Sequence, residues 1–571
     1  MNHRAKSLGC PHVTLNAVVA AALAAAAGQA GAFQVETDNP DLKVRWDNTV
    51  RYNLGTRIEA QDKRILANPA YDESDAKFGK GDIVTNRIDW LSELDVNYAG
   101  KVGLRVSAAA WHDDAYRDRK VTSPAAGGAI PTSYYGNTYN NTVKRYVNGP
   151  SGEFLDAFVW SNFSLGEVPV NVKLGRHTVV WGEGLLIGGH AISYGQAPVD
   201  GVKAVTSPGI ETKEVFLPVN QLSFRAQLTD KLSLAGQYFL EWKPTRVPNG
   251  GTYLMGADTS PNVDRLGLAP GVAADRVAPR KPGDTGNWGL ALKWDVDAID
   301  STLGFFYREF YDYNPETGIQ FTSFRQLVPG NPATTVPATF RFVYPEKQKL
   351  IGASLARRLG PVSFGAEVSL RQNTHLNSKT TYLPNENTGA RGDTLHIIAN
   401  GIYMLPKTAL WDSGSLIVEL AHSRLQKITA NPNLYRGEGY AGCIKSGTSN
   451  VPGDRSDGCS TKHFTQLALN FAPQYLQVFP SWDISVPITL NVGLRGNAPT
   501  GGGGFEKLKS WSIGINAIYA SVHEFSLRYS DISVPGKYDP TGTQLIGGNS
   551  LGSTLGATDR GWLVFTYKTS F

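Results

Sequence analysis

Apolar and polar residues alternate along many short stretches of the chain. At the C-terminal end, Leu563, Phe565, Tyr567 and Phe571 share one face, and mostly polar residues share the other. A period of two is typical of a β-strand, because successive side chains point to opposite faces. The same alternation recurs at 42–54, 362–370, 488–494 and 511–519. The pattern therefore predicts an all-β fold.

The lengths of the connections distinguish a membrane barrel from a soluble sandwich, which would show a similar alternation. Outer-membrane barrels have short turns at one end and longer loops at the other. Here long connections between expected strands, such as 113–153 and 178–219, alternate with short ones such as 229–230 and 360–361. We therefore predict a transmembrane antiparallel up-and-down β-barrel of about eighteen strands.

The expected strands lie near 42–54, 87–98, 101–112, 154–164, 168–177, 220–228, 231–243, 287–296, 302–313, 348–359, 362–372, 393–404, 414–424, 463–474, 483–494, 507–521, 524–532 and 561–571. Residues 318–344 could hold a further hairpin, which leaves sixteen or twenty strands open. Trp294, Trp411 and Trp482 stand beside expected short turns. An indole there can bury its ring and keep its N–H near water, so these residues predict an aromatic girdle.

The last strand carries a further signal. Its apolar face holds Phe565 and Tyr567, and the chain ends on Phe571. This resembles the C-terminal signal that the assembly machinery recognises in outer-membrane barrels. We therefore expect that machinery and outer-membrane lipid as partners.

The N-terminal 32 residues have the order of a secretory signal peptide. Arg4 and Lys6 precede the apolar stretch from Val13 to Ala27, and small residues follow up to Ala32. This apolar core is too short to anchor a helix in a bilayer. We predict cleavage after Ala32, which divides the chain into a signal peptide (1–32) and an outer-membrane β-barrel (33–571).

Export also decides the state of the cysteines. Cys10 leaves with the signal peptide, so Cys443 and Cys459 remain. In an oxidising compartment the pair is expected to form a disulfide, which on the chain-entropy model adds about 3 kcal/mol for a loop of this size.

Composition excludes several other classes. Charged residues make up 18% and aromatic residues 10% of the 571, which argues against a disordered chain. The net charge of +5 comes from interspersed residues, so nucleic acid is not expected as a partner. The acidic loop Asp72, Glu73, Asp75 and Asp82 has irregular spacing, and we expect neither a metal site nor a cofactor. Adjacent residues such as His422 and Ser423 point to opposite faces of a strand, which argues against an enzyme.

The segment 178–219 is the expected constriction of the pore. It lacks strand alternation over about 42 residues, which is unusual for a loop without a function, and it mixes apolar with charged residues. We expect the strand before it to break at Gly175, so that Arg176 turns inward and pairs with Glu183. A purely structural ion pair that holds the loop down is the alternative. The candidate substrate or constriction residues are Arg176, Trp181, Glu183, Tyr194, Asp200, Lys203, Glu211 and Lys213.

Two stretches resemble a known family. The run LDAFVWSNFSLGEVPVNVKLGRHTVVWGEGLLIGGHAISYGQAPVD and the start FQVETDNPDLKVRWDNTVRYNLGTRI are similar to a Gram-negative outer-membrane family catalogued as domain of unknown function 1302. The surroundings of Gly175, Arg176, Trp181, Gly182 and Glu183 are the most specific part. The resemblance implies an outer-membrane barrel in the traffic of hydrophobic or lipid-like molecules.

Together these features predict a porin-like channel or transporter for small-molecule cargo, with 178–219 as its constriction. A periplasmic or inner-membrane transport partner is compatible with this function. The alternative is a non-transporting surface or assembly barrel that displays its long loops to a partner.

Overall fold

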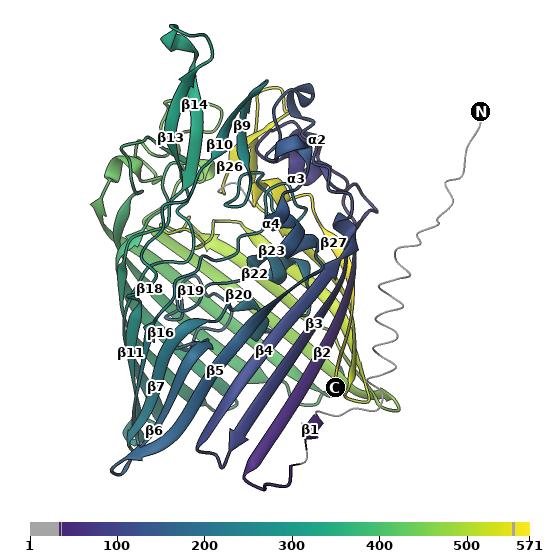
Figure 1. Cartoon of the computed structure of the whole chain (residues 1–571), viewed down its shortest axis with the longest axis vertical. Coiled ribbons are helices and arrows are strands. Elements are labelled where there is room, and N and C mark those ends of the chain that lie inside the picture. The colour runs from purple at the N-terminus through teal and green to yellow at the C-terminus, as the bar shows by residue number, and fades with distance from the viewer. Residues whose placement is uncertain (1–32, 36, 551–553) are drawn as a thin grey trace, which may run out of the picture.

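Eighteen strands of the described chain form one closed antiparallel barrel (Figure 1). The computed structural model describes residues 33–35, 37–550 and 554–571, so the predicted signal peptide lies outside the described residues. The wall consists of β2 (Leu42–Arg57), β3 (Ile83–Tyr98), β4 (Val102–Asp113), β5 (Ser151–Leu165), β6 (Val168–His177), β7 (Val219–Thr229), β8 (Leu232–Phe239), β11 (Trp288–Val296), β12 (Ser301–Phe310), β15 (Gln348–Leu359), β16 (Val362–His375), β18 (Arg391–Met404), β19 (Ser413–Ala430), β20 (His463–Phe479), β21 with β22 (Trp482–Ser485 and Ile488–Arg495), β23 (Lys509–Tyr519), β24 (His523–Ser533) and β27 (Trp562–Ser570).

The barrel closes where its last strand pairs with its first. β27 pairs with β2 from Thr49↔Ser570 to Arg57↔Trp562. Beyond β27, Phe571 still exchanges two backbone hydrogen bonds with Asn48, of 2.9 and 2.8 Å. Closure matters because an open edge in lipid would leave backbone N–H and C=O groups without partners.

One predicted strand is divided. The stretch expected at 483–494 appears as β21 and β22, which are separated at Val486 and Pro487. A proline has no N–H to donate to a ladder, so the pairing is interrupted there. Both pieces pair with β20 and β23, so the two together occupy one place in the wall.

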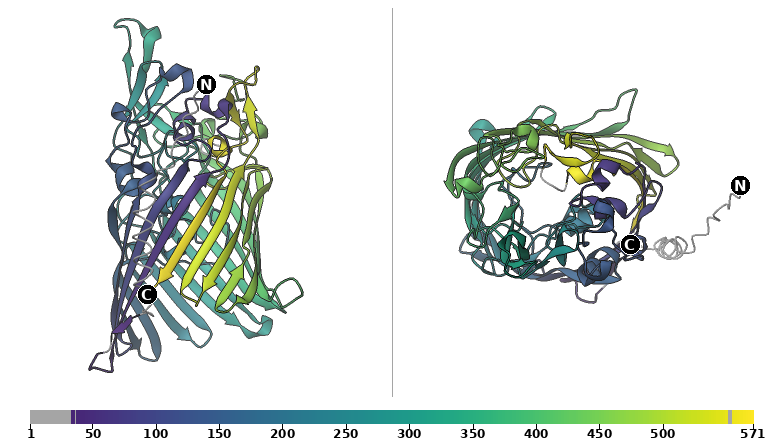
Figure 2. Two further views of the ribbon diagram at one scale, coloured as in Figure 1. Left: turned by 90° about the vertical axis from the view of Figure 1, so that its right-hand side faces the viewer. Right: turned by 90° about the horizontal axis from the view of Figure 1, so that it is seen from above.

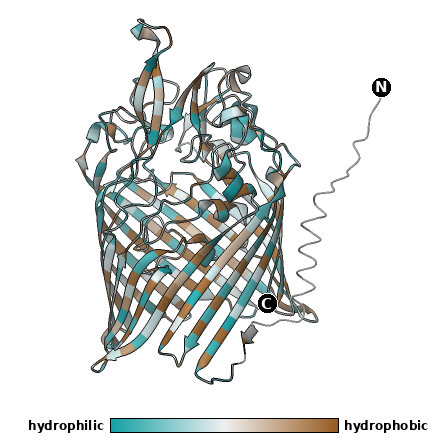
Figure 3. Cartoon of the chain, viewed as in Figure 1, coloured by the Kyte–Doolittle hydropathy of each residue, from teal (hydrophilic) through white to brown (hydrophobic). Residues whose placement is uncertain are grey.

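The two faces of the wall differ as the alternation predicted. Colouring by hydropathy shows hydrophilic and hydrophobic residues alternating along the strands (Figure 3). Large apolar side chains of the wall are exposed on the outside, including Leu174, Leu222, Leu290, Phe305, Ile351, Val368, Ile397, Leu420, Ile513, Ile515 and Leu527. The intervening positions hold buried polar and charged residues such as Arg308, Glu367, Arg371 and Glu419.

Short turns and long loops lie at opposite ends of the barrel, as predicted. The turns at 99–101, 166–167, 230–231, 360–361 and 520–522 lie at the end that also holds the C-terminus (Figure 1). β1 (Phe33–Val35) pairs with β2 there. Aromatic rings gather near this end, where Trp482 packs 5.0 Å from Tyr519 and 5.8 Å from Phe525 between ring centroids.

The long loops at the other end build a structured cap. Its elements are α2 (Lys63–Leu66), α3 (Asp72–Ala76), α4 (Asn141–Val143), β9 (Arg265–Ala269), β10 (Val272–Arg276), β13 (Ile319–Gln326), β14 (Thr335–Phe342), β17 (Thr381–Tyr382), β25 (Gly536–Tyr538) and β26 (Leu545–Gly548).

The hairpin considered at 318–344 exists as β13 and β14, but it joins a five-stranded sheet of the cap and not the wall. The wall therefore has eighteen strands. Among the described residues, no helix has the length and apolar character that crossing a membrane would require.

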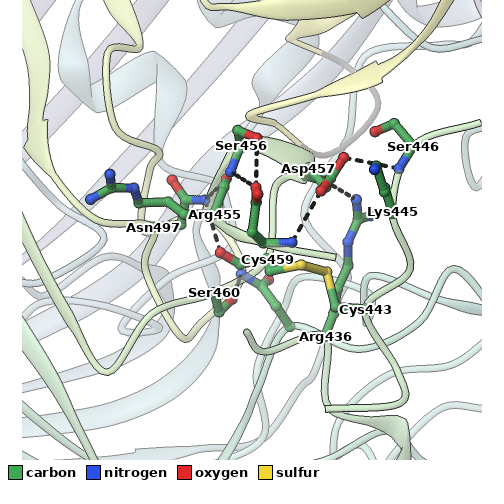
Figure 4. The surroundings of a disulfide bond; sticks show 12 residues. Arg436, Cys443, Lys445, Ser446, Arg455, Ser456, Asp457, Cys459, Ser460 and Asn497 are labelled. Atoms are coloured by element: carbon green, nitrogen blue, oxygen red, sulfur yellow. Dashed lines mark hydrogen bonds between the residues drawn. A yellow bond between two sulfur atoms is a disulfide. The ribbon is translucent and has the colours of Figure 1, made fainter. Parts of the chain in front are cut away.

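The predicted disulfide is present in the cap loop between β19 and β20. Cys443 and Cys459 are both fully buried and their Cα atoms lie 5.7 Å apart. Asp457 accepts a hydrogen bond from the Ser446 backbone N–H (2.9 Å) within the loop that the bond closes (Figure 4). It also pairs with Lys537, which lies outside that loop. The disulfide thus fixes a loop that docks on a neighbouring loop.

Candidate functional site: the lumen segment 178–218

The connection between β6 and β7 turns into the barrel and follows its inner wall. It contains two short helices, α5 (Gly201–Thr206) and α6 (Thr212–Val215). Seen from above, chain segments lie inside the ring of strands (Figure 2). Gly182 begins the inward course with φ of 100°, and a Cβ there would collide with the Glu367 carboxylate. A residue with a side chain would therefore push the segment off the wall.

Two buried glutamates of the wall hold the first part of the segment by its backbone. Glu419 on β19 accepts hydrogen bonds from the N–H groups of Leu185 (2.6 Å), Leu186 (2.9 Å) and Ile187. Glu367 on β16 accepts from Gly184 (2.8 Å), Ile192 (2.7 Å) and Glu183. A carboxylate has about four lone-pair sites, so each one can satisfy three such donors. The two carboxylates therefore fix a non-regular backbone inside the barrel.

Two buried arginines hold the returning part through its carbonyl oxygens. Arg371 donates to the carbonyls of Gly189 and Ala191, both at 2.9 Å. Arg308 donates to those of Ile192 and Tyr194 (2.8 Å each) and Gly195 (2.7 Å). Each arginine is only 1% exposed. Glutamates thus bind the N–H groups and arginines the C=O groups of one stretch, which leaves few backbone groups without partners.

Ion pairs hold the second half of the segment to the opposite arc of the wall. Glu214 on α6 pairs with Arg51 of β2 at 2.6 Å. Lys203 on α5 pairs with Glu153 of β5 at 2.9 Å. Lys213 pairs with Glu93 of β3. The segment therefore contacts the inner wall along both β11–β20 and β2–β5.

The predicted site residues other than Arg176 lie in contacts that hold the segment, and one predicted pairing is corrected. β6 does not break at Gly175 but continues to His177. Arg176 stays on the outward face and donates to the Phe154 carbonyl at 3.2 Å. Within the described chain, Glu183 instead faces Lys293 at 3.5 Å. The expected pair between Arg176 and Glu183 is wrong, because Gly175 adopts its φ of 123° without interrupting the ladder.

The polar members of the predicted set hold the segment in place. Asp200 is 1% exposed, caps the N-terminus of α5 and pairs with Arg246 at 2.7 Å. Glu211 forms a capping box on α6 and pairs with Lys213 at 3.1 Å. The Tyr194 hydroxyl donates to Asp312, and burial together with that carboxylate raises the pKa of Tyr194, which keeps the phenol neutral.

Apolar contacts complete the attachment. Trp181 is 7% exposed and packs with Phe306, Ile192 and Leu350 against β11 and β12. Ile187 packs with Ile398 of β18 and with one alanine each from β19 and β20. Of the glutamate anchors, Glu367 lies on the polar face of the alternation at 362–370, which indicates that it faces the lumen. Glu419 is not among the residues singled out from the sequence, although it is the one carboxylate in an otherwise apolar stretch of β19, and that isolation is the available signal.

Two cavities lie between the segment and the wall. One of about 540 Å³ is bounded by Val179, Val180 and Trp181 of the segment and by inward residues of β6, β7, β8 and β11. Its wall includes Lys173, Arg225 and Lys293 but no carboxylate among the described lining residues. The other, of about 530 Å³, includes Glu183 and Leu185 and is bounded by β12, β15, β16 and β18 and by the β11–β12 turn. Both are large enough to hold a small molecule.

Comparisons with known proteins agree with the sequence resemblance. A family model described as "Protein of unknown function (DUF1302)" matches residues 13–571. No curated protein matches this chain. Among solved structures, the chain is similar to OccAB1 of Acinetobacter baumannii, with 10% identity, a TM-score of 0.42 and coverage of 95% of this chain and 99% of that one. It is also similar to OpdK of Pseudomonas aeruginosa with vanillate, with 10% identity, a TM-score of 0.37 and coverage of 92% and 98%.

Proposed function

The chain belongs to the DUF1302 family of proteins of unknown function, and we propose that it is an outer-membrane channel for small molecules with an apolar body. The observation that carries the proposal is the lumen segment, which is anchored to the inner wall of a closed barrel and leaves two cavities beside it. A barrel that merely displayed its loops would not require a built interior of this kind.

The outer surface supports a membrane location. Exposed Leu, Ile, Val and Phe side chains alternate with inward polar residues on successive strands. A contiguous apolar surface of this extent is costly in water, but it suits the hydrocarbon core of a bilayer. The aromatic rings near the short-turn end match the girdle that barrels place at the membrane interface.

The first cavity suggests the chemistry of the cargo. Val179, Val180 and Trp181 offer apolar surface, whereas Lys173 and Arg225 offer positive charge. Lys293 completes the set, although it also faces Glu183. Pockets for small molecules combine an apolar lining with a few polar groups that orient the ligand. We therefore propose hydrophobic or lipid-like molecules that carry a negative head group, such as a medium-chain carboxylate.

Conductance and flux measurements test this proposal. Protein reconstituted in planar bilayers should conduct, and its reversal potential in a KCl gradient should show a preference for anions. The triple variant Lys173→Gln, Arg225→Gln, Lys293→Gln should lose that preference and pass decanoate into liposomes more slowly. The expected effect is electrostatic, because a cavity lined by positive charges raises the local concentration of anions.

A matched control removes three charges elsewhere. Lys63, Lys80 and Lys281 are exposed on the cap, and their exchange for Gln should leave selectivity and decanoate flux unchanged. If the folded wild-type barrel neither conducts nor passes decanoate, the channel proposal is wrong and a role in displaying the cap loops to a partner is favoured.

A further inference from the structure

A cluster of positive side chains stands at the ends of β19, β20, β22 and β23 nearest the cap, on their outer face, with Lys462 in the loop one residue before β20 begins. We call it the basic rim and define it by five exposed residues: Arg424, Lys462, His463, Arg495 and Lys509. Arg424 and His463 are directly opposed across β19 and β20. His422, Arg424, Lys462 and Arg495 all lie within electrostatic reach of the His463 ring.

The rim lacks neutralising partners. Within the described chain, Arg424, Lys462, Arg495 and Lys509 form no ion pair. The four strands carry one carboxylate between them, Glu419, and it is buried inside the barrel against the lumen segment. In the neighbouring cap loop, by contrast, Arg455 is paired with Glu506 at 3.0 Å. Gathering unpaired like charges is unfavourable unless an anion compensates them.

The position of the rim relates it to the membrane. On the same outward faces, and farther from the cap, the strands expose Leu420, Trp511, Ile513 and Ile515. Apolar side chains below and cations above form the profile of a membrane interface, where chains of a lipid meet the strands and its head group meets the charges. A soluble anion would use the charges but not the apolar surface beneath them.

We propose that the basic rim binds the phosphate groups of an anionic lipid of the outer leaflet, with the acyl chains against β19–β23. Arg424 and Arg495 present planar guanidinium groups that can donate two parallel hydrogen bonds to one phosphate, and Lys462 and Lys509 add point charges. This inference rests on the proposed membrane location but not on channel activity.

Native mass spectrometry of the full-length protein tests the rim. The protein is placed in phosphatidylcholine nanodiscs with and without bisphosphorylated lipid A, and retained lipid is counted after release. Wild type should retain lipid A. The double variant Arg424→Gln, Arg495→Gln should reduce its retention about tenfold or more, because each cation near a membrane surface adds a similar increment to the binding of an anionic lipid. Retention should also fall with added salt.

Two controls distinguish the outcomes. Lys101→Gln with Arg358→Gln removes two exposed charges near the short-turn end and should retain lipid A as wild type does. Inorganic phosphate at millimolar concentration should not displace the lipid. Equal retention by the rim variant and wild type would overturn the proposal, and so would displacement by free phosphate, which would show an anion site without lipid specificity. Heat-modifiable migration on gels checks that both variants fold. Unchanged conductance of the rim variant would show that loss of lipid binding is distinct from loss of channel function.

Discussion

Replacing Glu419 by Ala should release the first part of the lumen segment while the barrel stays closed. The Glu419 carboxylate is 0% exposed and accepts the N–H groups of Leu185, Leu186 and Ile187. It also accepts from the Asn400 side chain at 3.1 Å. Alanine removes all of these acceptors at once and leaves three backbone donors without a partner.

The expected size of the effect follows from these contacts. An N–H group left without an acceptor in a buried site costs about 1 to 3 kcal/mol. Water that enters the lumen can replace part of each bond, so we take the lower value for each of the three donors. The sum is about 3 kcal/mol, which corresponds to more than a hundredfold change in the opening equilibrium.

Hydrogen–deuterium exchange of the reconstituted protein measures this opening. Amides at 185–187 should exchange about a hundredfold faster in Glu419→Ala. Amides at 201–214 should change little, because Glu153 and Arg51 hold that half separately. The matched control is Glu309→Ala, whose carboxylate accepts from Tyr307 on the wall. Unchanged exchange at 185–187 in a folded barrel would refute the anchoring role of Glu419, as would equal acceleration in the control.

Three further predictions concern the cap and the closure. Exchanging Cys443 and Cys459 for Ser should lower the stability of their loop by about 3 kcal/mol, seen as faster proteolysis within 431–462 with an intact barrel. Burial and Asp72 raise the pKa of Asp258 to about 7. Cap stability should therefore fall as the pH rises from about 4 to 7, and Asp258→Asn should flatten this dependence in limited proteolysis. Deleting Phe571 removes two backbone bonds to Asn48 and should lower the heat-modifiable, assembled fraction, whereas a full yield would contradict its assembly role.

The wall was predictable because its signal is local. Alternation over about ten residues reports a strand with one apolar and one polar face, and the alternation of gap lengths reports which ends are joined by turns. Eighteen strands were predicted and eighteen form the wall. The main departures, a division at Pro487 and an earlier end of β8 at Phe239, alter the bounds but not the order.

The hairpin β13–β14 shows where local information ends. Residues 319–342 pair with each other as the pattern allowed, but a hairpin in the wall and a hairpin in the cap have the same local pairing. Its place is decided by neighbours distant in sequence, since β14 pairs with β10 and β13 with β17.

The sequence by itself determined a closed barrel, its strand order, the disulfide and an unusual loop at 178–219. Only the tertiary structure decided what holds that loop. Glu419 and Leu185 are 234 residues apart, and Arg371 and Gly189 are 182 apart. Apart from proline, which lacks the N–H, every residue carries the same backbone N–H and C=O groups. No pattern of side chains therefore marks which of them a distant carboxylate or guanidinium will bind.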